Sequence, residues 1–205
     1  MLRYEAIQPE TLDLLRALAP EPVLKDFALV GGTSLALQLG HRLSVDLDLF
    51  TSKDFSTEQV LEALEPHFDL VVTGRAEHSL NCRINGIKVD ILRHRYDLLN
   101  DLVIEDEIKL WSIQDIAAAK ISAITNRGSK KDFYDLVEIL KQIPLDKVLN
   151  LFEQKYPSAE RFMAMKSLSW FEDAEIEPDP IMLTELSWEE VKETILESLK
   201  KVVNS

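Results

Sequence analysis

Cysteine is almost absent from this chain of 205 residues, which contains Cys82 and no other. A single cysteine excludes an internal disulfide and a cysteine-rich zinc site. Because Cys82 alternates with the apolar residues Leu80 and Ile84, we predict that it occupies a buried strand position and is not a reactive thiol.

Long apolar runs are missing as well. No run approaches the roughly 18 residues that a membrane-spanning helix requires, and the segment 1–5 lacks the apolar region of a signal peptide. We therefore expect a cytoplasmic protein with no membrane partner. Apolar residues still make up 46% of the sequence, which is enough to bury the core of one large domain or two smaller ones.

Basic residues are in deficit, with 23 Lys and Arg against 36 Asp and Glu and a net charge of −13. Such a chain is not expected to bind nucleic acid over its whole surface. The imbalance is uneven: residues 75–131 contain ten basic and eight acidic side chains, whereas residues 146–205 contain seven and thirteen. A local basic face for a nucleotide or an RNA end is compatible with this distribution.

The spacing of apolar residues predicts a mixed α/β segment followed by helices alone, with the change near residue 108. In the first segment it predicts helices at 9–18, 33–40 and 56–66 and strands at 27–30, 46–51, 68–73, 80–84 and 87–91. In the second it predicts helices at 112–125, 131–140, 145–154, 158–168 and 187–202, with an acidic loop at 172–180. We therefore predict an α+β fold, with a mixed sheet and flanking helices in residues 1–108 and a helical domain in residues 109–205.

The most informative pattern begins at the predicted strand 27–30. The pair Gly31-Gly32 after this strand lets the backbone turn and approach a ligand closely. Thr33 or Ser34 is then expected to cap a helix, and a helix N-terminus attracts anions. These residues predict a place for phosphate groups.

Two aspartates follow on the next predicted strand. Asp46 and Asp48 are two residues apart, so their carboxylates project from the same face of the strand. Like charges at that separation repel one another, and a cation is needed to keep both ionised. Carboxylate oxygens suit Mg²⁺, which also accepts phosphate oxygens as ligands.

These strings resemble a known family. Gly-Gly-Thr-Ser-Leu-Ala-Leu at residues 31–37 and Gly-His-Arg-x-Ser-x-Asp-Leu-Asp-Leu-Phe at residues 40–50 are similar to the AbiEii/AbiGii toxin family, a branch of the polymerase-beta-type nucleotidyltransferases. The resemblance is strong over residues 28–50 and extends more weakly to about residue 190. It implies a nucleotidyltransferase-type core, with the helical domain packing over the active-site cleft.

The resemblance also implies a reaction: transfer of a nucleoside monophosphate from a nucleoside triphosphate (NTP) to an acceptor hydroxyl, with Mg²⁺ as cofactor and Mn²⁺ as an alternative ion. Asp46 and Asp48 would hold the metal, and Asp90 on a neighbouring strand would complete the metal site and activate the acceptor. The residues Gly31–Ser34 would bind the β- and γ-phosphates. The family implies a toxin, with a tRNA 3′ end or another RNA as acceptor and a cognate antitoxin as partner.

A second family motif has a lysine in one helix, an arginine at its end and Lys-Asp-x-x-Asp-Leu at the start of the next helix. Lys120, Arg127 and the string at 131–136, which contains Asp132 and Asp135, resemble it. Lys120 and Arg127 are two helical turns apart and share a face, where they would neutralise a triphosphate. Because Lys120 lies at the edge of an apolar stripe, it needs solvent or an anion. Asp132 is a further catalytic candidate, and helix-terminal charge or an ion pair is the simpler explanation of both aspartates.

Several alternatives stay open from the residues alone. His41-Arg42 is either a contact to substrate phosphate or a local salt bridge, and Arg93-His94-Arg95 is either a basic rim beside Asp90 or a solvated strand end. An aminoglycoside-type nucleotidyltransferase acting on a small molecule is one rival, and it predicts an acidic pocket in place of a basic groove. A non-enzymatic binding protein that keeps the fold is the other, and the retention of three candidate carboxylates argues against it.

Overall fold

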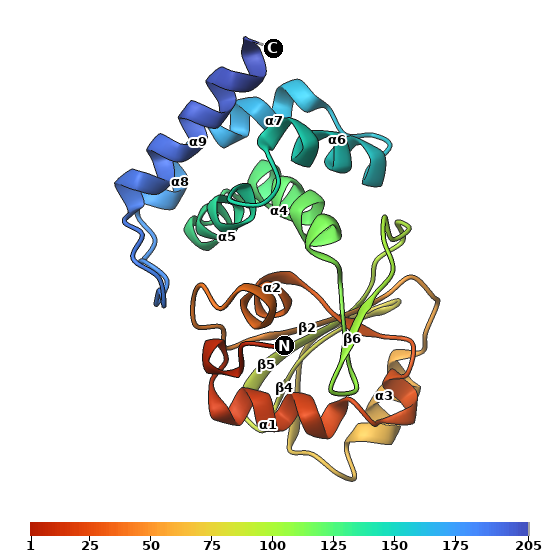
Figure 1. The fold of residues 1–205 in the computed structure, drawn as a ribbon. Coiled ribbons are helices and arrows are strands. Elements are labelled where there is room, and N and C mark those ends of the chain that lie inside the picture. Colours follow the sequence, from red (N-terminus) through yellow and green to blue (C-terminus); the bar gives the residue numbers. More distant parts are fainter. Residues whose placement is uncertain (205) are drawn as a thin grey trace. The chain divides into compact units, whose positions relative to one another are not determined.

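The computed structural model describes residues 1–204 (Figure 1), so Ser205, the last residue of the predicted helical domain, lies outside the described part. The residues pack into two units. The sheet unit comprises Met1–Gly40, Ser44–Asp97 and Asp101–Trp111, and the helical unit comprises His41–Leu43, Leu98–Asn100 and the described residues from 112 to 204. Each unit is described by itself below.

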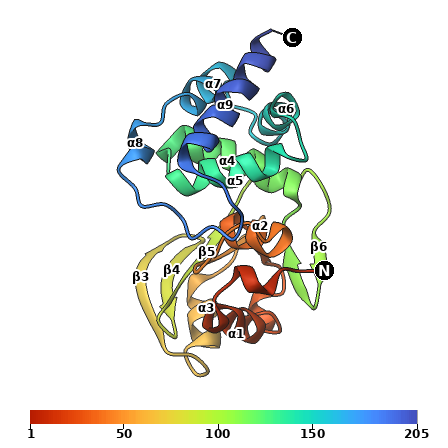
Figure 2. The same ribbon diagram turned by 60° about the vertical axis from the view of Figure 1, so that its left-hand side comes forward.

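The sheet unit is built on one mixed sheet, which contains seven strands within residues 1–204, in the order β3-β4-β5-β2-β1-β7-β6. The strands are β1 (Ala28–Leu29), β2 (Leu47–Thr51), β3 (Leu70–Ala76), β4 (Ser79–Ile84), β5 (Ile87–Arg93), β6 (Val103–Glu105) and β7 (Ile108–Leu110). Its helices are η1 (Tyr4–Ala6), α1 (Pro9–Leu18), η2 (Pro22–Leu24), α2 (Gly31–Leu39) and α3 (Thr57–Leu64). The pairs β2–β5 and β1–β7 are parallel and the other pairs are antiparallel. Figure 2 shows β3 and β6 at opposite edges of the sheet.

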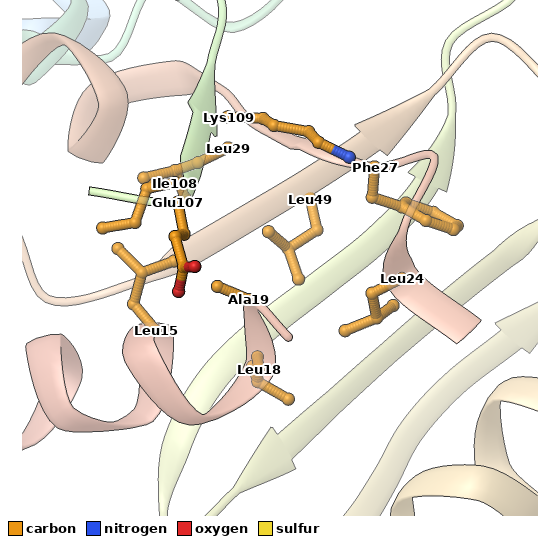
Figure 3. Close-up of a pocket in the computed structure, with 10 residues that line it drawn as sticks. All are labelled: Leu15, Leu18, Ala19, Leu24, Phe27, Leu29, Leu49, Glu107, Ile108 and Lys109. Atoms are coloured by element: carbon orange, nitrogen blue, oxygen red, sulfur yellow. The ribbon is translucent and has the colours of Figure 1, made fainter. Parts of the chain in front are cut away.

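One face of this sheet is buried against helices. The pattern in β2 alternates, with Leu47 and Leu49 buried and Asp48 and Phe50 half-buried, as a strand with one core face requires. The core cluster joins the buried strand residues to apolar residues of α1 and α3. A cavity of about 40 Å³ lies in this core beside α1, and Figure 3 shows Leu49 among its lining residues. This cavity is therefore on the face opposite to Asp48.

The predicted buried position of Cys82 is confirmed. Its side chain lies in the core on β4. Burial raises the pKa of the Cys82 thiol to about 11, and the charge of Asp90 adds to this increase. The thiol therefore stays protonated at neutral pH, which excludes it as a nucleophile.

Local sequence rules predicted several elements correctly. The predicted helix at 9–18 is α1, and the Asn85-Gly86 turn joins β4 to β5 with positive φ at both residues, as a type I′ hairpin requires. The hairpin β6–β7 was not predicted. Its turn residues Asp106 and Glu107 also have positive φ. Aspartate tolerates this conformation, but glutamate at the second position replaces the glycine of the usual Asp-Gly turn, so the hairpin signal was incomplete.

The helical unit contains α4 (Ile113–Arg127), α5 (Lys130–Leu140), α6 (Leu145–Lys155), α7 (Arg161–Leu168), α8 (Glu172–Glu175) and α9 (Trp188–Val203). Ser112 caps α4 by accepting a hydrogen bond from the Asp115 backbone N–H, and Ser187 with Glu190 forms a complete capping box on α9. The predicted acidic loop contains the short helix α8. No helix within residues 1–204 is both long enough and apolar enough to cross a membrane.

A buried ion pair ties three segments of the helical unit together. Lys155 Nζ lies 2.7 Å from Asp115 Oδ1, and both side chains are fully buried. Asp115 also accepts hydrogen bonds from the backbone N–H groups of Leu99 and Asn100 and from the Ser112 hydroxyl. The segment 98–100 is thereby fixed to α4 and α6.

We predict that Asp115→Asn lowers the free energy of unfolding by about 3 kcal/mol, because it leaves the Lys155 charge buried without its partner carboxylate. Urea unfolding followed by circular dichroism measures this effect. Glu197→Gln on the exposed face of α9 is the control and is expected to change stability by less than about 0.5 kcal/mol. Equal stability of the two variants would contradict a structural role for the pair.

Candidate active site

The parallel pairing of β2 with β5 brings two of the predicted carboxylates together. Asp48 is the direct register partner of Asp90, so the two side chains emerge from the same face of adjacent strands, about 4.8 Å apart at the backbone. Both are half-buried, whereas Leu47 and Val89 beside them face the core. Asp46 precedes the first residue of β2.

Helix α2 begins directly beside Asp48. Gly31 has a φ of +66°, and a Cβ atom at this position would lie 2.6 Å from Asp48 Oδ2. Gly31 is the first residue of α2, and the N-cap residue Val30 makes no side-chain hydrogen bond to the helix. The glycine therefore provides both the backbone conformation and the space that the Asp48 carboxylate occupies.

The structure corrects the expected roles of Thr33 and Ser34, which are buried inside the first turns of α2 and do not cap it. The Thr33 hydroxyl donates to the backbone carbonyl of Asp46 and shares a hydrogen bond of 2.7 Å with the Ser44 hydroxyl. Ser34 accepts a hydrogen bond from Gln38. Any anion at this helix end would therefore meet the backbone N–H groups of residues 31–33 and not these hydroxyls.

Two residues that were not predicted as site residues hold Asp90. Lys88 Nζ lies 2.7 Å from Asp90 Oδ2, and Asn81 Nδ2 donates to Asp90 Oδ1 at 2.8 Å. The hydrogen bond to Asp90 raises the pKa of Lys88; burial opposes this increase, and the charges of Asp90, Asp48 and Asp46 add to it. All three candidate carboxylates therefore act on one ammonium group. Both residues could have been found from the sequence. Lys88 lies two residues before Asp90 on β5 and so shares its face, and the Asn85-Gly86 turn sets the register that places Asn81 opposite Asp90.

The carboxylates of Asp48 and Asp90 suit a Mg²⁺ ion that takes its remaining ligands from a substrate. No group of three His, Cys, Asp or Glu side chains within residues 1–204 is arranged to hold a metal ion. Asp48 and Asp90 nevertheless offer carboxylate oxygens from adjacent strands, and Mg²⁺ is often held by one or two carboxylates together with substrate phosphates. The pair therefore fits an ion that arrives with a nucleotide.

The second predicted motif forms a buried cluster within the helical unit, which we call the Lys120 cluster: Lys120, Asp132, Asp135, Arg127, Arg42 and His41. Lys120 Nζ lies 2.8 Å from Asp132 Oδ1 and also contacts Asp135 Oδ2. The Arg127 guanidinium makes two hydrogen bonds to Asp132, of 2.8 and 3.1 Å. The expected need of Lys120 for an anion is met by these two aspartates.

His41 and Arg42 belong to the same cluster through Asp135. Arg42 binds this carboxylate with Nε at 2.6 Å and Nη2 at 2.9 Å, and His41 Nε2 lies 2.7 Å from Oδ1. His41, Arg42 and Asp135 are each at least nine-tenths buried. The structure therefore supports the local salt bridge for this pair of residues.

Burial and charge pairing oppose each other in the Lys120 cluster, and the pairing dominates. Burial alone lowers the pKa of Lys120 and raises the pKa of Asp132 and Asp135. The neighbouring opposite charges reverse both effects, so that the pKa of Lys120 is raised, that of Asp132 is lowered, and that of Asp135 is held well below 3.8. Lys120, Asp132 and Asp135 are therefore all ionised at neutral pH.

The mixed sheet, the paired carboxylates and the glycine-initiated helix beside them define a nucleotidyltransferase fold. A family model described as "Nucleotidyl transferase AbiEii toxin, Type IV TA system" matches residues 13–110 and 86–202. The chain belongs to this AbiEii nucleotidyl transferase toxin family, as the resemblance of its motifs predicted, and it is a transferase.

Relatives of the chain agree with this assignment. An uncharacterised protein of Aquifex aeolicus is 31% identical over 213 residues, with 100% of both chains covered. The JHP933 protein of Helicobacter pylori has a similar structure, with a TM-score of 0.58, 16% identity and coverage of 97% of this chain and 95% of that one. The nucleotidyltransferase toxin MenT4 of Mycobacterium tuberculosis has a TM-score of 0.58, 18% identity and coverage of 97% and 86%. These two structures confirm the predicted fold class.

We predict that Gly31→Ala destabilises the protein and also weakens metal binding. Positive φ costs an L-residue about 1–2 kcal/mol, and the new methyl group must displace the Asp48 carboxylate. Gly86→Ala is the matched control, because Gly86 has a φ of +81° and open space around it. Urea unfolding is expected to show a loss for both variants, and calorimetric titration with Mn²⁺ to show weaker binding for Gly31→Ala alone. Unchanged Mn²⁺ affinity in Gly31→Ala would contradict the role of this glycine.

The Lys120 cluster predicts a pH dependence of stability. Because the pKa values of Asp132 and Asp135 are lowered on folding, their contribution is present above the unfolded value near 3.8 and is lost as the pH falls through the folded values. The raised pKa of Lys120 means that its contribution is complete below 10.5 and is lost as the pH rises through its folded value.

We therefore predict that Asp135→Asn lowers the free energy of unfolding at pH 7 by about 3–5 kcal/mol, since it leaves buried cations without a carboxylate. The difference from the unsubstituted protein should shrink as the pH falls from about 4 toward 2. Urea unfolding at a series of pH values measures it. A difference that stays constant over this range would show that Asp135 is not ionised in the folded protein.

Proposed function

We propose that this protein transfers a nucleoside monophosphate from an NTP to the hydroxyl group of an RNA, in a reaction that depends on Mg²⁺ or Mn²⁺. One observation carries the proposal: Asp48 is the register partner of Asp90 and lies against Gly31 at the start of α2, where the N-cap residue Val30 makes no side-chain hydrogen bond to the helix. Carboxylates for a metal ion and backbone N–H groups for phosphates are the parts that phosphoryl transfer requires.

In the proposed reaction the acceptor oxygen bonds to the α-phosphorus, the bond from that phosphorus to the bridging oxygen breaks, and pyrophosphate leaves. Asp48, with Asp46 and Asp90, would hold the metal, which supplies charge neutralisation when it is bound. The N–H groups at Gly31–Thr33 would bind the β- and γ-phosphates. Asp90 would orient the acceptor hydroxyl and take its proton.

The resemblance to the family's second motif assigns Lys120 and Arg127 to neutralising the triphosphate, and this role is part of the proposal. Lys120, Arg127 and Arg42 all bind the carboxylates of Asp132 and Asp135. The Arg127 side chain is 59% exposed, so part of this guanidinium is accessible to solvent. Asp132 binds both Lys120 and Arg127 and would act by positioning them.

The biological role is part of the same proposal. The family description names a toxin of a toxin–antitoxin system, and MenT4 is called a nucleotidyltransferase toxin. We propose that this chain is likewise a toxin, with the 3′ end of tRNA as acceptor and a cognate antitoxin protein as partner.

The test is incubation of the protein with each labelled NTP, Mg²⁺ and either total RNA or total protein. We expect label in the RNA fraction and loss of transfer by at least 100-fold in Asp48→Asn, because the substitution removes a metal ligand. The same substitution relieves repulsion, so the variant should be as stable as the unsubstituted protein or slightly more stable. Asp13→Asn, at an exposed position on α1, is the control with unchanged transfer. Label confined to protein, or to added aminoglycoside, would contradict an RNA acceptor.

A further inference from the structure

A hollow of about 430 Å³ lies next to the candidate active site, where β4 begins and β5 ends. Ser79 and Leu92, which line it, are register partners, and the pair Asn81 and Asp90 lies two positions away on the same two strands. Leu92 therefore shares the strand face of Asp90 and lies about 7 Å further along it. The hollow begins within the length of one nucleotide from Asp90.

The charges around the hollow leave one cation unpaired. Asp54 forms an ion pair with Arg93 and lies 3.5 Å from His78 Nε2, and the other acid, Glu77, is 90% exposed. Arg95 also lines the hollow, and no acidic side chain within residues 1–204 forms an ion pair with it. An anionic group that entered the hollow would find this guanidinium available, and arginine binds phosphate through two parallel hydrogen bonds.

Aromatic rings lie beside the same segment. The His94 ring stacks on Phe50 with centroids 5.9 Å apart and meets the Tyr96 ring edge-on at 5.3 Å. Phe50 follows Asp48 by two residues on β2, so it shares the face of Asp48 as Leu92 shares that of Asp90. The His94 backbone N–H donates to the carbonyl of Thr51 at 2.7 Å and holds the segment against β2. Arg93 and Arg95 thus line the hollow, while the His94 ring lies against Phe50 and the Tyr96 ring lies against His94.

We propose that Arg95, Tyr96 and the hollow at the end of β5 bind the 3′-terminal part of a single-stranded RNA, with a backbone phosphate on Arg95 and a base on the Tyr96 ring. This inference rests on the proposed function, and it names the acceptor subsite. Cations that track a phosphate backbone, together with aromatic rings that stack on unpaired bases, are the two elements of single-strand recognition. The β- and γ-phosphates of the NTP are assigned to the N-terminus of α2, so the two substrates would approach Asp48 and Asp90 from different sides.

The first experiment measures binding without catalysis. The probe is a fluorescein-labelled single-stranded oligoribonucleotide of about eight nucleotides with a free 3′ hydroxyl, titrated with protein at several salt concentrations in the absence of NTP and metal. We expect Arg95→Ala to weaken binding at least fivefold and to reduce the slope of log affinity against log salt by about 0.7, the value for one lost phosphate contact on a single strand. Arg83→Ala is the matched control, since Arg83 is an exposed arginine of β4 that bonds the Gly86 carbonyl.

The second variant tests the stacking contact. Tyr96→Ala should weaken binding about fivefold with an unchanged salt slope, because stacking is not an electrostatic contact with phosphate. Tyr96→Phe should bind as the unsubstituted protein does, because the ring is kept. Affinities of Arg95→Ala and Tyr96→Ala equal to that of Arg83→Ala would overturn the subsite, as would equally tight binding of a blunt RNA duplex.

Failure of the subsite and failure of the proposed function give different results. Asp48→Asn should bind the oligonucleotide with unchanged affinity while its transfer activity is lost. If RNA receives label and Arg95→Ala leaves its KM for RNA unchanged, the subsite is wrong and the proposed function stands. If Arg95→Ala and Tyr96→Ala weaken RNA binding but label appears only in protein, the RNA-binding subsite stands and the proposed acceptor is wrong.

Discussion

The parallel pairing of β2 with β5 is the constraint on which the rest of the candidate site depends. These strands are separated by about forty residues of sequence, yet their register sets Asp48 directly opposite Asp90. A slip of one residue would turn one of these carboxylates into the apolar core and bring a leucine or valine to the site. The buried residues on the other face of both strands therefore fix the positions of the acids as firmly as any contact that the acids make.

Placing two carboxylates side by side costs free energy through repulsion, and three neighbouring groups reduce this cost. Lys88 supplies a positive charge at Asp90, Asn81 supplies a neutral hydrogen bond, and the missing side chain of Gly31 gives the Asp48 carboxylate room. In the proposed function a metal ion with its nucleotide would compete with Lys88 for Asp90, because both cations need the same carboxylate. The ammonium would then be free to turn toward phosphate, a motion that its half-exposed side chain permits.

The sequence predicted those features whose causes are local. The Asn85-Gly86 hairpin, the caps at Ser112 and Ser187 and the buried strand position of Cys82 all follow from a few neighbouring residues. The start of α2 was placed two residues too late, because glycine is a poor helix former and the space it leaves for Asp48 is visible only in three dimensions. His41 and Arg42, two of the partners of Asp135, are more than ninety residues away from it, and no local rule joins residues at that distance. The family resemblance, and not periodicity, connected Asp90 to the other two acids.

In the proposed site, backbone groups would bind the donor nucleotide, whereas side chains would bind the acceptor. The donor phosphates are assigned to backbone N–H groups at the start of α2, whose positions are fixed by the helix and which do not depend on side-chain identity. The acceptor is assigned to the side chains of Arg95 and Tyr96 at the end of a strand, where a single substitution changes the chemistry of the surface without disturbing the sheet. A nucleotidyltransferase built in this way can therefore change its acceptor by substitutions at the end of β5 while the carboxylate pair and the phosphate-binding helix stay the same. Under these two proposals, acceptor choice would depend on residues 93–96, whereas the transfer chemistry would depend on the β2–β5 register.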